Sequence, residues 1–256
     1  MTKQKRILII AACVLFASMV TGCVMAIWAG NRYTRMYGAT LSPSFTVTAH
    51  TGAMGTKKNS IDSIVKSAES GADIVEFDIM YREDGTPVLA HYEKEIKNAP
   101  TLREAFAAAA AYPCLGFNVD LKEFTYVDRV EELILEFNLQ DKAFFTGIHL
   151  KDVAEVKEKA PNIRFYLNTD FTNKLKNDTA AMDKEIASAL EIGAIGLNLG
   201  YKYLTKELVT RAHAANLLVS VYTPSTKWAF SGIMHLGADN ITTKRPDKLF
   251  SVIKGN

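Results

Sequence analysis

The chain has little cysteine. Of its three cysteines, Cys13 and Cys23 fall in an apolar N-terminal segment, and only Cys114 lies beyond it. The rest of the chain therefore cannot form an internal disulfide, and it has no cysteine spacing of the kind that binds zinc. We expect Cys114 to be a small buried residue of the core.

A strong charge of either sign is also missing. The 256 residues carry a formal net charge of only +2, and no run of like charges marks an interaction tail. Proteins that bind nucleic acid usually present a basic surface, so nucleic acid is not an expected partner. Hydrophobic residues make up 48% of the chain. That content allows one domain of about 215 residues beyond the N-terminal segment.

The N-terminal segment contains a long apolar run. Residues 7–29 include no charged side chain, and three basic residues precede the run while two follow it. A run of this length can span a bilayer, whereas the apolar part of a cleaved signal peptide is usually shorter. We predict an uncleaved transmembrane helix in the cell membrane. The larger positive charge before it places the N-terminus in the cytoplasm and the remaining chain outside.

The same segment offers an alternative anchor. The sequence VTGC, residues 20–23, resembles the cleavage box of bacterial lipoproteins, in which Cys23 would carry the lipid. The chain stays apolar beyond Cys23, which favours the transmembrane helix. Both alternatives place the domain on the outer face of the membrane. The predicted organisation is a membrane anchor or signal segment, a tether and one folded domain, at residues 1–30, 31–44 and 45–256.

Strand-like and helix-like runs alternate throughout the domain. The expected strands are residues 45–50, 72–78, 116–122, 143–147, 163–168, 194–200, 218–223 and 240–243, with a short extra strand at 88–91. The expected helices are residues 60–70, 102–112, 127–138, 152–159, 179–191, 206–215, 228–235 and a last helix from 246. Alternation of this kind indicates parallel strands joined by helices, and eight principal strands predict a (β/α)8 TIM barrel. The predicted fold class is thus an α/β barrel preceded by a transmembrane helix.

The strand GADIVEFD, residues 71–78, carries two carboxylates on one side. Side chains alternate along a strand, so Glu76 and Asp78 point the same way. Burying two like charges side by side is unfavourable unless a cation or hydrogen bonds compensate them. Ca²⁺ and Mg²⁺ prefer oxygen ligands, so the pattern predicts a site for a divalent cation.

Other polar side chains follow neighbouring strands. His50 and His91 each end an apolar run, and Asp120 and Lys122 share one side of the strand GFNVDLK. Active sites of such barrels lie at the carboxyl ends of the strands. Two histidines beside a cation could deliver and remove a proton near neutral pH.

These motifs resemble the glycerophosphodiester phosphodiesterase family. Its sequences open with HRG and ENT, then GAD-x-(I/V)-E-x-D, DG-x-(P/L)-V and a second histidine, where this chain reads HTG, KNS, GADIVEFD, DGTPV and AHYE. The closing segment GADNITTKRPD also looks like that of the family. The resemblance extends from Phe45 to the end. It implies that His50 and His91 are the acid/base pair and that Glu76, Asp78 and Asp120 bind Ca²⁺ or Mg²⁺.

The resemblance also implies residues that contact the substrate. Lys122 would lie close to the phosphate, and Tyr222, where the family often has tryptophan, would line the cleft. Three departures stand out: the family arginine is Thr51 here, the glutamate of ENT is Lys58, and the third metal ligand, usually glutamate, is Asp120. Lys58 could replace the arginine as a point charge, although without its planar geometry.

The predicted function is metal-dependent hydrolysis of glycerophosphodiesters to an alcohol and glycerol 3-phosphate, in phospholipid metabolism at the outer membrane face. The substrate is a small-molecule or lipid phosphodiester. The segment VDLK also looks like the sphingomyelinase D group, which implies a lyase that forms cyclic phosphates from lysophospholipids or sphingolipids. A third alternative is a barrel with little catalysis that binds phospholipid head groups. The other histidines, at positions 149, 213 and 235, are interpreted as structural.

Overall fold

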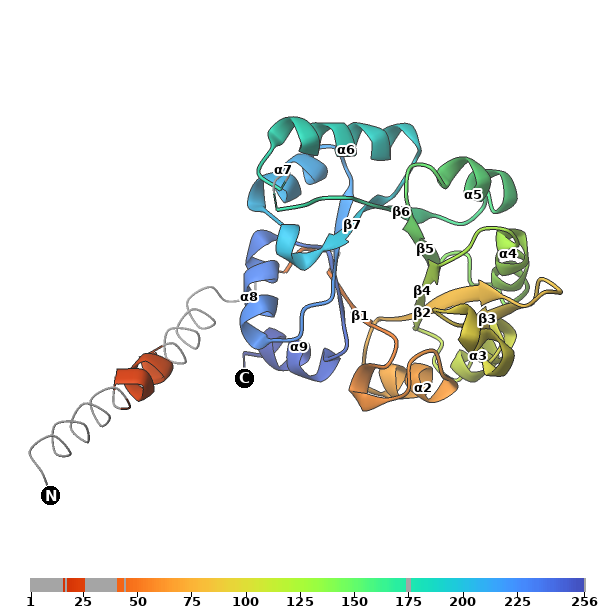
Figure 1. The fold of residues 1–256 in the computed structure, drawn as a ribbon, viewed down its shortest axis with the longest axis horizontal. Coiled ribbons are helices and arrows are strands. Elements are labelled where there is room, and N and C mark those ends of the chain that lie inside the picture. The colour runs from red at the N-terminus through yellow and green to blue at the C-terminus, as the bar shows by residue number, and fades with distance from the viewer. Residues whose placement is uncertain (1–15, 17, 26–40, 44, 174–175, 256) are drawn as a thin grey trace, which may run out of the picture.

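The described part of the chain contains a closed barrel of parallel strands. The computed structural model describes residues 16, 18–25, 41–43, 45–173 and 176–255. Within them, helices surround a ring of eight parallel strands (Figure 1). The strands of the ring are β1 (Thr46–Ala49), β2 (Ile74–Tyr81), β4 (Gly116–Leu121), β5 (Ala143–Ile148), β6 (Phe165–Asn168), β7 (Gly196–Gly200), β8 (Leu218–Tyr222) and β9 (Asn240–Thr243). The predicted TIM barrel is confirmed.

The strand order follows the sequence around the ring. Each strand pairs in parallel with the next, and β1 pairs with both β9 and β2, which closes the barrel. Strand β3 (Pro87–Leu89) stands apart, because it pairs antiparallel to the far end of β2 and forms a hairpin with it. The hairpin positions His91, which lies two residues after the end of β3.

Helices follow the barrel strands, as expected for β/α units. They are α2 (Ile61–Glu69), α3 (Leu102–Ala109), α4 (Val127–Glu136), α5 (Val153–Lys159), α6 (Thr179–Glu191), α7 (Lys206–Ala214), α8 (Lys227–Leu236) and α9 (Pro246–Ile253). Short 3₁₀ turns lie at Ala53–Gly55, Glu93–Asn98 and Tyr201–Tyr203. Several helices begin at a hydroxyl or carboxylate cap; Ser60, for example, accepts a hydrogen bond from the Ser63 amide at the start of α2.

The main apolar core lies between the strands and the helices. Phe77 of β2 is 1% exposed and contacts Phe106 of α3 edge-to-face, and Phe106 contacts Phe117 of β4 in the same way. Since side chains alternate along a strand, the outward direction of Phe77 turns Glu76 and Asp78 toward the barrel interior. The packing of β2 against α3 therefore fixes the orientation of both carboxylates.

The predicted membrane anchor lies largely outside the described residues. Residues 16 and 18–25 are helical, and Met19, Val20 and Val24 are exposed. Among the described residues, no helix has both the length and the apolar character needed to span a membrane. Of the predicted tether, only residues 41–43 are described.

The expectation for Cys114 is wrong. Its side chain is exposed in the turn that joins α3 to β4, and the neighbouring Leu115 is buried instead. Connecting segments lie at the protein surface, so a cysteine in such a turn can be exposed even where the next residue is buried.

Candidate active site

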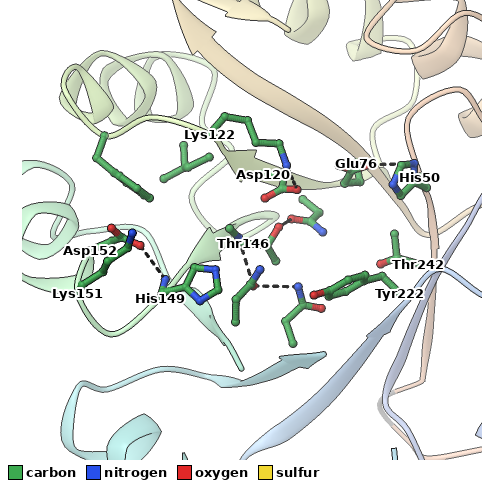
Figure 2. A pocket seen from close by; sticks show the side chains of 16 residues that line it. His50, Glu76, Asp120, Lys122, Thr146, His149, Lys151, Asp152, Tyr222 and Thr242 are labelled. Carbon is green, nitrogen blue, oxygen red and sulfur yellow. Dashed lines mark hydrogen bonds and ion pairs between the residues drawn. The ribbon is translucent and has the colours of Figure 1, made fainter. Parts of the chain in front are cut away.

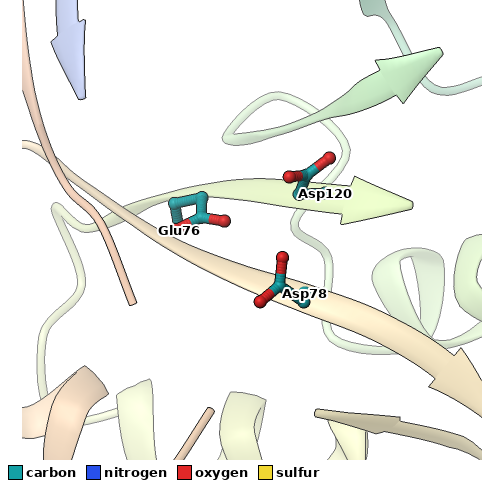
Figure 3. Close-up of side chains that lie close together, drawn as sticks. All are labelled: Glu76, Asp78 and Asp120. Atoms are coloured by element: carbon teal, nitrogen blue, oxygen red, sulfur yellow. The ribbon is translucent and has the colours of Figure 1, made fainter. Parts of the chain in front are cut away.

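Three carboxylates converge inside the barrel because of how β2 and β4 pair. The parallel register places Asp78 directly beside Asp120, and Glu76 lies two residues earlier on the same face of β2. One oxygen from each of the three lies within 4.8 Å of the others (Figure 3). Strand alternation placed Glu76 and Asp78 together and the family resemblance grouped Asp120 with them; the structure brings all three side chains together.

Among the described residues, Glu76 and Asp120 each keep one oxygen without a hydrogen-bond partner, whereas both oxygens of Asp78 have partners. Glu76 Oε2 accepts from the Thr51 amide at 2.7 Å, and Asp78 Oδ2 accepts from Asn59 Nδ2 at 2.9 Å. Asp120 Oδ1 is buried and has no hydrogen-bond partner within the described part of the chain. A buried carboxylate oxygen without a partner is unfavourable, and a hard cation would satisfy it. The three residues therefore fit a divalent cation.

The pKa values of the three carboxyl groups show the cost of placing them together. Burial raises the pKa of Glu76 well above its ordinary value, and the charges of Asp78 and Asp120 raise it further. Burial also raises the pKa of Asp120 against the opposing effect of Lys122. For Asp78 burial acts in the same direction, but Lys122, Asn59 and His91 together bring its pKa below the ordinary value. Without a cation, simultaneous ionisation of all three carboxyl groups is therefore unfavourable.

Lys122 is bound to two of the carboxylates. Its ammonium lies 2.9 Å from Asp78 Oδ1 and 2.7 Å from Asp120 Oδ2. Burial lowers the pKa of Lys122, but the two carboxylates more than reverse this effect and raise it. Lys122 is therefore a permanent positive charge at the centre, and much of that charge is already neutralised by its partners.

His50 directly follows β1 and lies at the edge of the carboxylate group. Its Nδ1 is 2.9 Å from the Thr51 carbonyl and 3.7 Å from Glu76 Oε2. A carbonyl only accepts hydrogen bonds, so Nδ1 of the neutral ring must donate and Nε2 carries the lone pair. Burial lowers the pKa of His50, with a further lowering from Lys244. His50 is therefore neutral at pH 7 and can accept a proton.

His91 reaches the site through the β2–β3 hairpin. Strand β3 runs back along the end of β2, and the Ala90 amide donates to the Asp78 carbonyl at 3.1 Å. His91 follows at once, with Nδ1 3.0 Å from Asp78 Oδ1. That contact orients the imidazole, whose Nε2 has no partner among the described residues.

Thr51 takes a structural position where the family has arginine. Its side chain is buried, donates to Asn59 Oδ1 at 3.0 Å and accepts from the Asn59 amide at 2.6 Å. Asn59 in turn contacts both the side chain and the backbone of Asp78. Thr51 and Asn59 thus fix the carboxylates, and the Thr51 side chain does not reach the cleft as a charge.

A cleft of two joined lobes opens above the carboxylates. The first lobe, of about 470 Å³, is lined by Thr51, Lys58, Asp78, His91, Thr223, Pro224, Ser225 and Lys244, together with four shared residues. The second, of about 390 Å³, extends from Glu76 to His149 and Lys151 (Figure 2). His50, Asp120, Lys122 and Tyr222 line both lobes. Tyr222 is 36% exposed at the end of β8, so it lies at the cleft as the sequence suggested.

Gly147 makes room for Asp120. It has φ +81°, and a Cβ on it would lie 2.4 Å from Asp120 Oδ1 and 2.3 Å from the Leu121 carbonyl oxygen. Both distances are far below contact, so any other residue would displace the aspartate. The glycine after Thr146 on β5 is thus part of what shapes the second lobe.

The rest of the barrel interior is polar but neutral. We call this the amide side; it consists of the buried Asn118, Thr146, Asn198 and Asn240 and the partly buried Asn168. Thr146 donates to Asn118 at 2.7 Å, and Asn198 donates to Asn168 at 3.0 Å. Asn240 donates to Thr48 at 2.7 Å. Glu76, Asp78 and Asp120 form the acidic side, with Asn118 directly beside Glu76 and Thr146 directly beside Asp120 in the sheet.

Sequence reasoning missed three residues of the cleft. His149 was interpreted as structural, yet it lines the second lobe, where its Nδ1 lies 3.3 Å from Asp170 Oδ1. Lys151 lines the same lobe and Lys244 the first. Each follows a barrel strand within a few residues, and position at a carboxyl end was the signal that could have found them. By contrast, His213 pairs with Asp239 at 2.8 Å and does not line either lobe.

The fold and the cleft define the class of protein. It is a (β/α)8 barrel with a polar, acidic cleft at the carboxyl ends of its strands, where barrel enzymes carry their active sites. A model of the glycerophosphoryl diester phosphodiesterase family matches residues 111–248, just over half of the chain. The chain therefore belongs to the glycerophosphoryl diester phosphodiesterase family and is a phosphoric diester hydrolase. The resemblance seen in the sequence is confirmed.

Similar proteins come from several organisms. A glycerophosphodiester phosphodiesterase of Bacillus altitudinis is 21% identical over 242 residues, which covers 80% of this chain and 96% of that protein. The crystal structure of a putative glycerophosphodiester phosphodiesterase from Galdieria sulphuraria is 19% identical, with a TM-score of 0.70 over 82% of this chain and 98% of the other.

A second similar structure contains a reaction product. It is a phosphodiesterase from Oleispira antarctica in complex with the product sn-glycerol-3-phosphate, 21% identical, with a TM-score of 0.69 over 82% of this chain and 96% of the other. At such low identities the structural likeness demonstrates a shared barrel fold.

Proposed function

We propose that this protein hydrolyses glycerophosphodiesters to an alcohol and glycerol 3-phosphate with the help of a divalent cation. The observation that carries the proposal is the acidic side, where three carboxylates lie within 4.8 Å of one another and Asp120 Oδ1 is buried without a partner. The product bound to the Oleispira antarctica phosphodiesterase supports the same substrate class for this chain.

Glu76, Asp78 and Asp120 would hold the cation, Ca²⁺ or Mg²⁺. When bound, the cation supplies Lewis-acid stabilisation of charge on the phosphoryl oxygens. Lys122, held by Asp78 and Asp120, adds a fixed positive charge next to the phosphate. The substrate phosphate would therefore lie between the acidic side and the two histidines.

The hydrogen bonds of the two histidines suggest which is the base. His50 is neutral, with its Nδ1–H donated to the Thr51 carbonyl, so its Nε2 would take a proton from the attacking water. The oxygen of that water forms the new bond to phosphorus as the bond to the alcohol breaks. His91, oriented by Asp78, would donate a proton to the departing alcohol oxygen. Tyr222 and Lys58 would border the substrate at the cleft.

Product analysis by ³¹P NMR tests this function. The full chain is incubated with glycerophosphocholine and, separately, with lysophosphatidylcholine, each with Ca²⁺, Mg²⁺ or EDTA. We expect glycerol 3-phosphate from glycerophosphocholine with metal and none with EDTA. A cyclic phosphate from lysophosphatidylcholine would show the cyclising lyase instead, and no turnover of either substrate would favour a binding role.

The location at the outer membrane face is part of the proposal. It rests on the uncharged run of residues 7–29 and on the exposed apolar side chains of residues 18–25, among them Met19 and Val24. Membrane fractionation of the full chain and of a chain beginning at residue 31 tests it. We expect only the longer chain in the membrane fraction. If Cys23→Ala releases the full chain, the lipoprotein anchor is correct and the transmembrane helix is wrong.

A further inference from the structure

Two lysines from distant parts of the sequence line the same lobe of the cleft. Lys58 precedes α2 and Lys244 follows β9, and His91 lines the lobe with them. Burial lowers the pKa of Lys244, and the nearby charge of Lys58 lowers it further, although Glu76 acts against both. The two ammonium groups are thus close enough to repel each other.

These two lysines differ from Lys122 in having no carboxylate partner. Lys122 makes two short ion pairs, whereas no ion pair joins Lys58 or Lys244 to a carboxylate among the described residues. Glu76 and Asp78 offset the repulsion at Lys244 only in part, because burial and Lys58 still lower its pKa, and an anion between the two lysines would relieve the repulsion.

The backbone before α2 makes room for Lys58. Gly52 has φ +76°, and a Cβ on it would lie 3.0 Å from Lys58 Cγ. The stem of Lys58 therefore lies against a turn that directly follows His50 and Thr51. Glycine suits this turn both because of its positive φ and because Lys58 occupies the space beside it.

The charges at the reaction centre leave the substrate without a counter-charge. Glu76, Asp78 and Asp120, when ionised, carry three negative charges, which Lys122 and one divalent cation together just balance. A phosphodiester brings one further negative charge. No arginine lines either lobe, and Thr51 is buried and hydrogen-bonded where the family has arginine.

We propose that Lys58 and Lys244 form a paired cationic subsite for the non-bridging oxygens of the phosphate, in place of the arginine absent at Thr51. The inference rests on the proposed function, since it concerns the phosphate of the same reaction. A phosphomonoester carries about −1.5 to −2 near neutral pH, so the pair holds the product more tightly than the substrate. The subsite therefore affects product release more than the chemical step.

Binding of sn-glycerol 3-phosphate and of inorganic phosphate to the full chain tests the subsite. Dissociation constants are measured by titration calorimetry with saturating Mg²⁺ for the wild type, Lys58→Ala, Lys244→Ala and the double variant. We expect roughly 3- to 10-fold weaker binding in each single variant, since Lys58 is exposed and Lys244 is partly exposed, and roughly 10- to 100-fold in the double variant.

Two controls separate a specific subsite from a general effect of positive charge. Lys57 is exposed beside Lys58 and lines neither lobe, so Lys57→Ala should bind phosphate as the wild type does. The variant with Lys58→Arg and Lys244→Arg should retain most of the affinity. Equal melting temperatures show that the variants are folded.

The result that overturns the subsite is a double variant that binds both anions as tightly as the wild type, or a wild type that binds neither. Equal weakening in Lys57→Ala also overturns it. These outcomes are independent of turnover. If the wild type binds phosphate through the two lysines but hydrolyses no glycerophosphodiester, the subsite stands and the proposed function fails.

Discussion

The acidic side and the amide side of the barrel interior are similarly enclosed but differ in their hydrogen bonding. On the amide side, Asn240 donates to Thr48, and its side-chain oxygen accepts from Ser220 at 3.1 Å. On the acidic side, Asp120 Oδ1 has no partner and the pKa of Glu76 is raised well above its ordinary value. Neutral groups that satisfy one another need nothing further, whereas the acidic side keeps an unsatisfied oxygen that a cation would satisfy.

The comparison distinguishes buried polar residues that stabilise the barrel from buried polar residues that could bind a ligand. Both sides arise from residues that point inward from parallel strands, so burial and strand position alone would not distinguish them. What distinguishes them is whether the group can be satisfied by its neighbours. Variants that change one side at a time test this distinction.

The largest effect is expected from neutralising the acidic side. In the double variant Asp78→Asn with Asp120→Asn, the cation would lose two of its three carboxylates and Lys122 its two partners. Because the cation supplies several kcal/mol of charge stabilisation, kcat/KM for glycerophosphocholine should fall by at least roughly 10⁴-fold. Steady-state hydrolysis at saturating Mg²⁺ measures this. Activity within 10-fold of the wild type would mean that the acidic side is structural.

Removing one histidine should lower activity while leaving metal binding intact. His50→Ala and His91→Ala should each reduce kcat by about 10²- to 10⁴-fold, since each removes one proton transfer. Calorimetric titration with Mg²⁺ checks that the affinity for the cation is retained. Near wild-type activity in both variants would remove the acid–base mechanism, and loss of metal affinity would assign the histidines to the cation instead.

Breaking the amide side should affect stability more than turnover. Asn240→Ala removes the donors to Thr46 and Thr48 and the acceptor for Ser220, deep in the barrel. Buried groups left unpaired cost about 1–3 kcal/mol, which lowers the melting temperature by roughly 2–12 °C in a domain of this size. Thermal unfolding and kcat at 25 °C measure both effects. A 100-fold loss of kcat in the folded variant would contradict the separation of the two sides.

The smallest effect concerns the stability of the metal-free protein. The pKa of Glu76 is raised in the folded state, so its ionisation becomes unfavourable for folding as the pH rises above the ordinary value of 4.5. The loss of stability begins near that pH and is complete once the pH exceeds the raised pKa. A pKa that is higher by one in the folded state than in the unfolded state lowers the free energy of unfolding by about 1.4 kcal/mol at high pH.

Glu76→Gln should remove this pH dependence, since glutamine can still accept from the Thr51 amide. In EDTA, urea unfolding at pH 5 and pH 8 compares the variant with the wild type. We expect the variant to be more stable by on the order of 1 kcal/mol or more at pH 8, and by less at pH 5. A variant that is less stable than the wild type at both values would show that ionised Glu76 is well compensated without a cation.

The sequence was sufficient to predict most of the barrel. Each of the eight strands lies within the run expected for it or overlaps it, because apolar strands and amphipathic helices alternate with short connections. The pair Glu76 and Asp78 was also evident, since the alternation of side chains along one strand is a local property. The prediction that Cys114 is buried was wrong, because its exposure depends on where the turn before β4 lies at the protein surface.

Contacts between distant segments were harder to predict. The side-by-side position of Asp78 and Asp120 depends on the register of β2 and β4, and the meeting of Lys58 with Lys244 depends on closure of the barrel. Neither is a property of a local pattern. His50 and His91 were predicted from their places at the ends of apolar runs and from the family motif, whereas their hydrogen bonds depend on the fold.

The central claim is that the acidic side holds a divalent cation. Calorimetric titration of the metal-stripped full chain with Ca²⁺ and with Mg²⁺, compared with the variant that carries Glu76→Gln, Asp78→Asn and Asp120→Asn, tests it most directly. The account predicts one cation per chain in the wild type and none at this site in the variant. Equal cation binding in both proteins would contradict it.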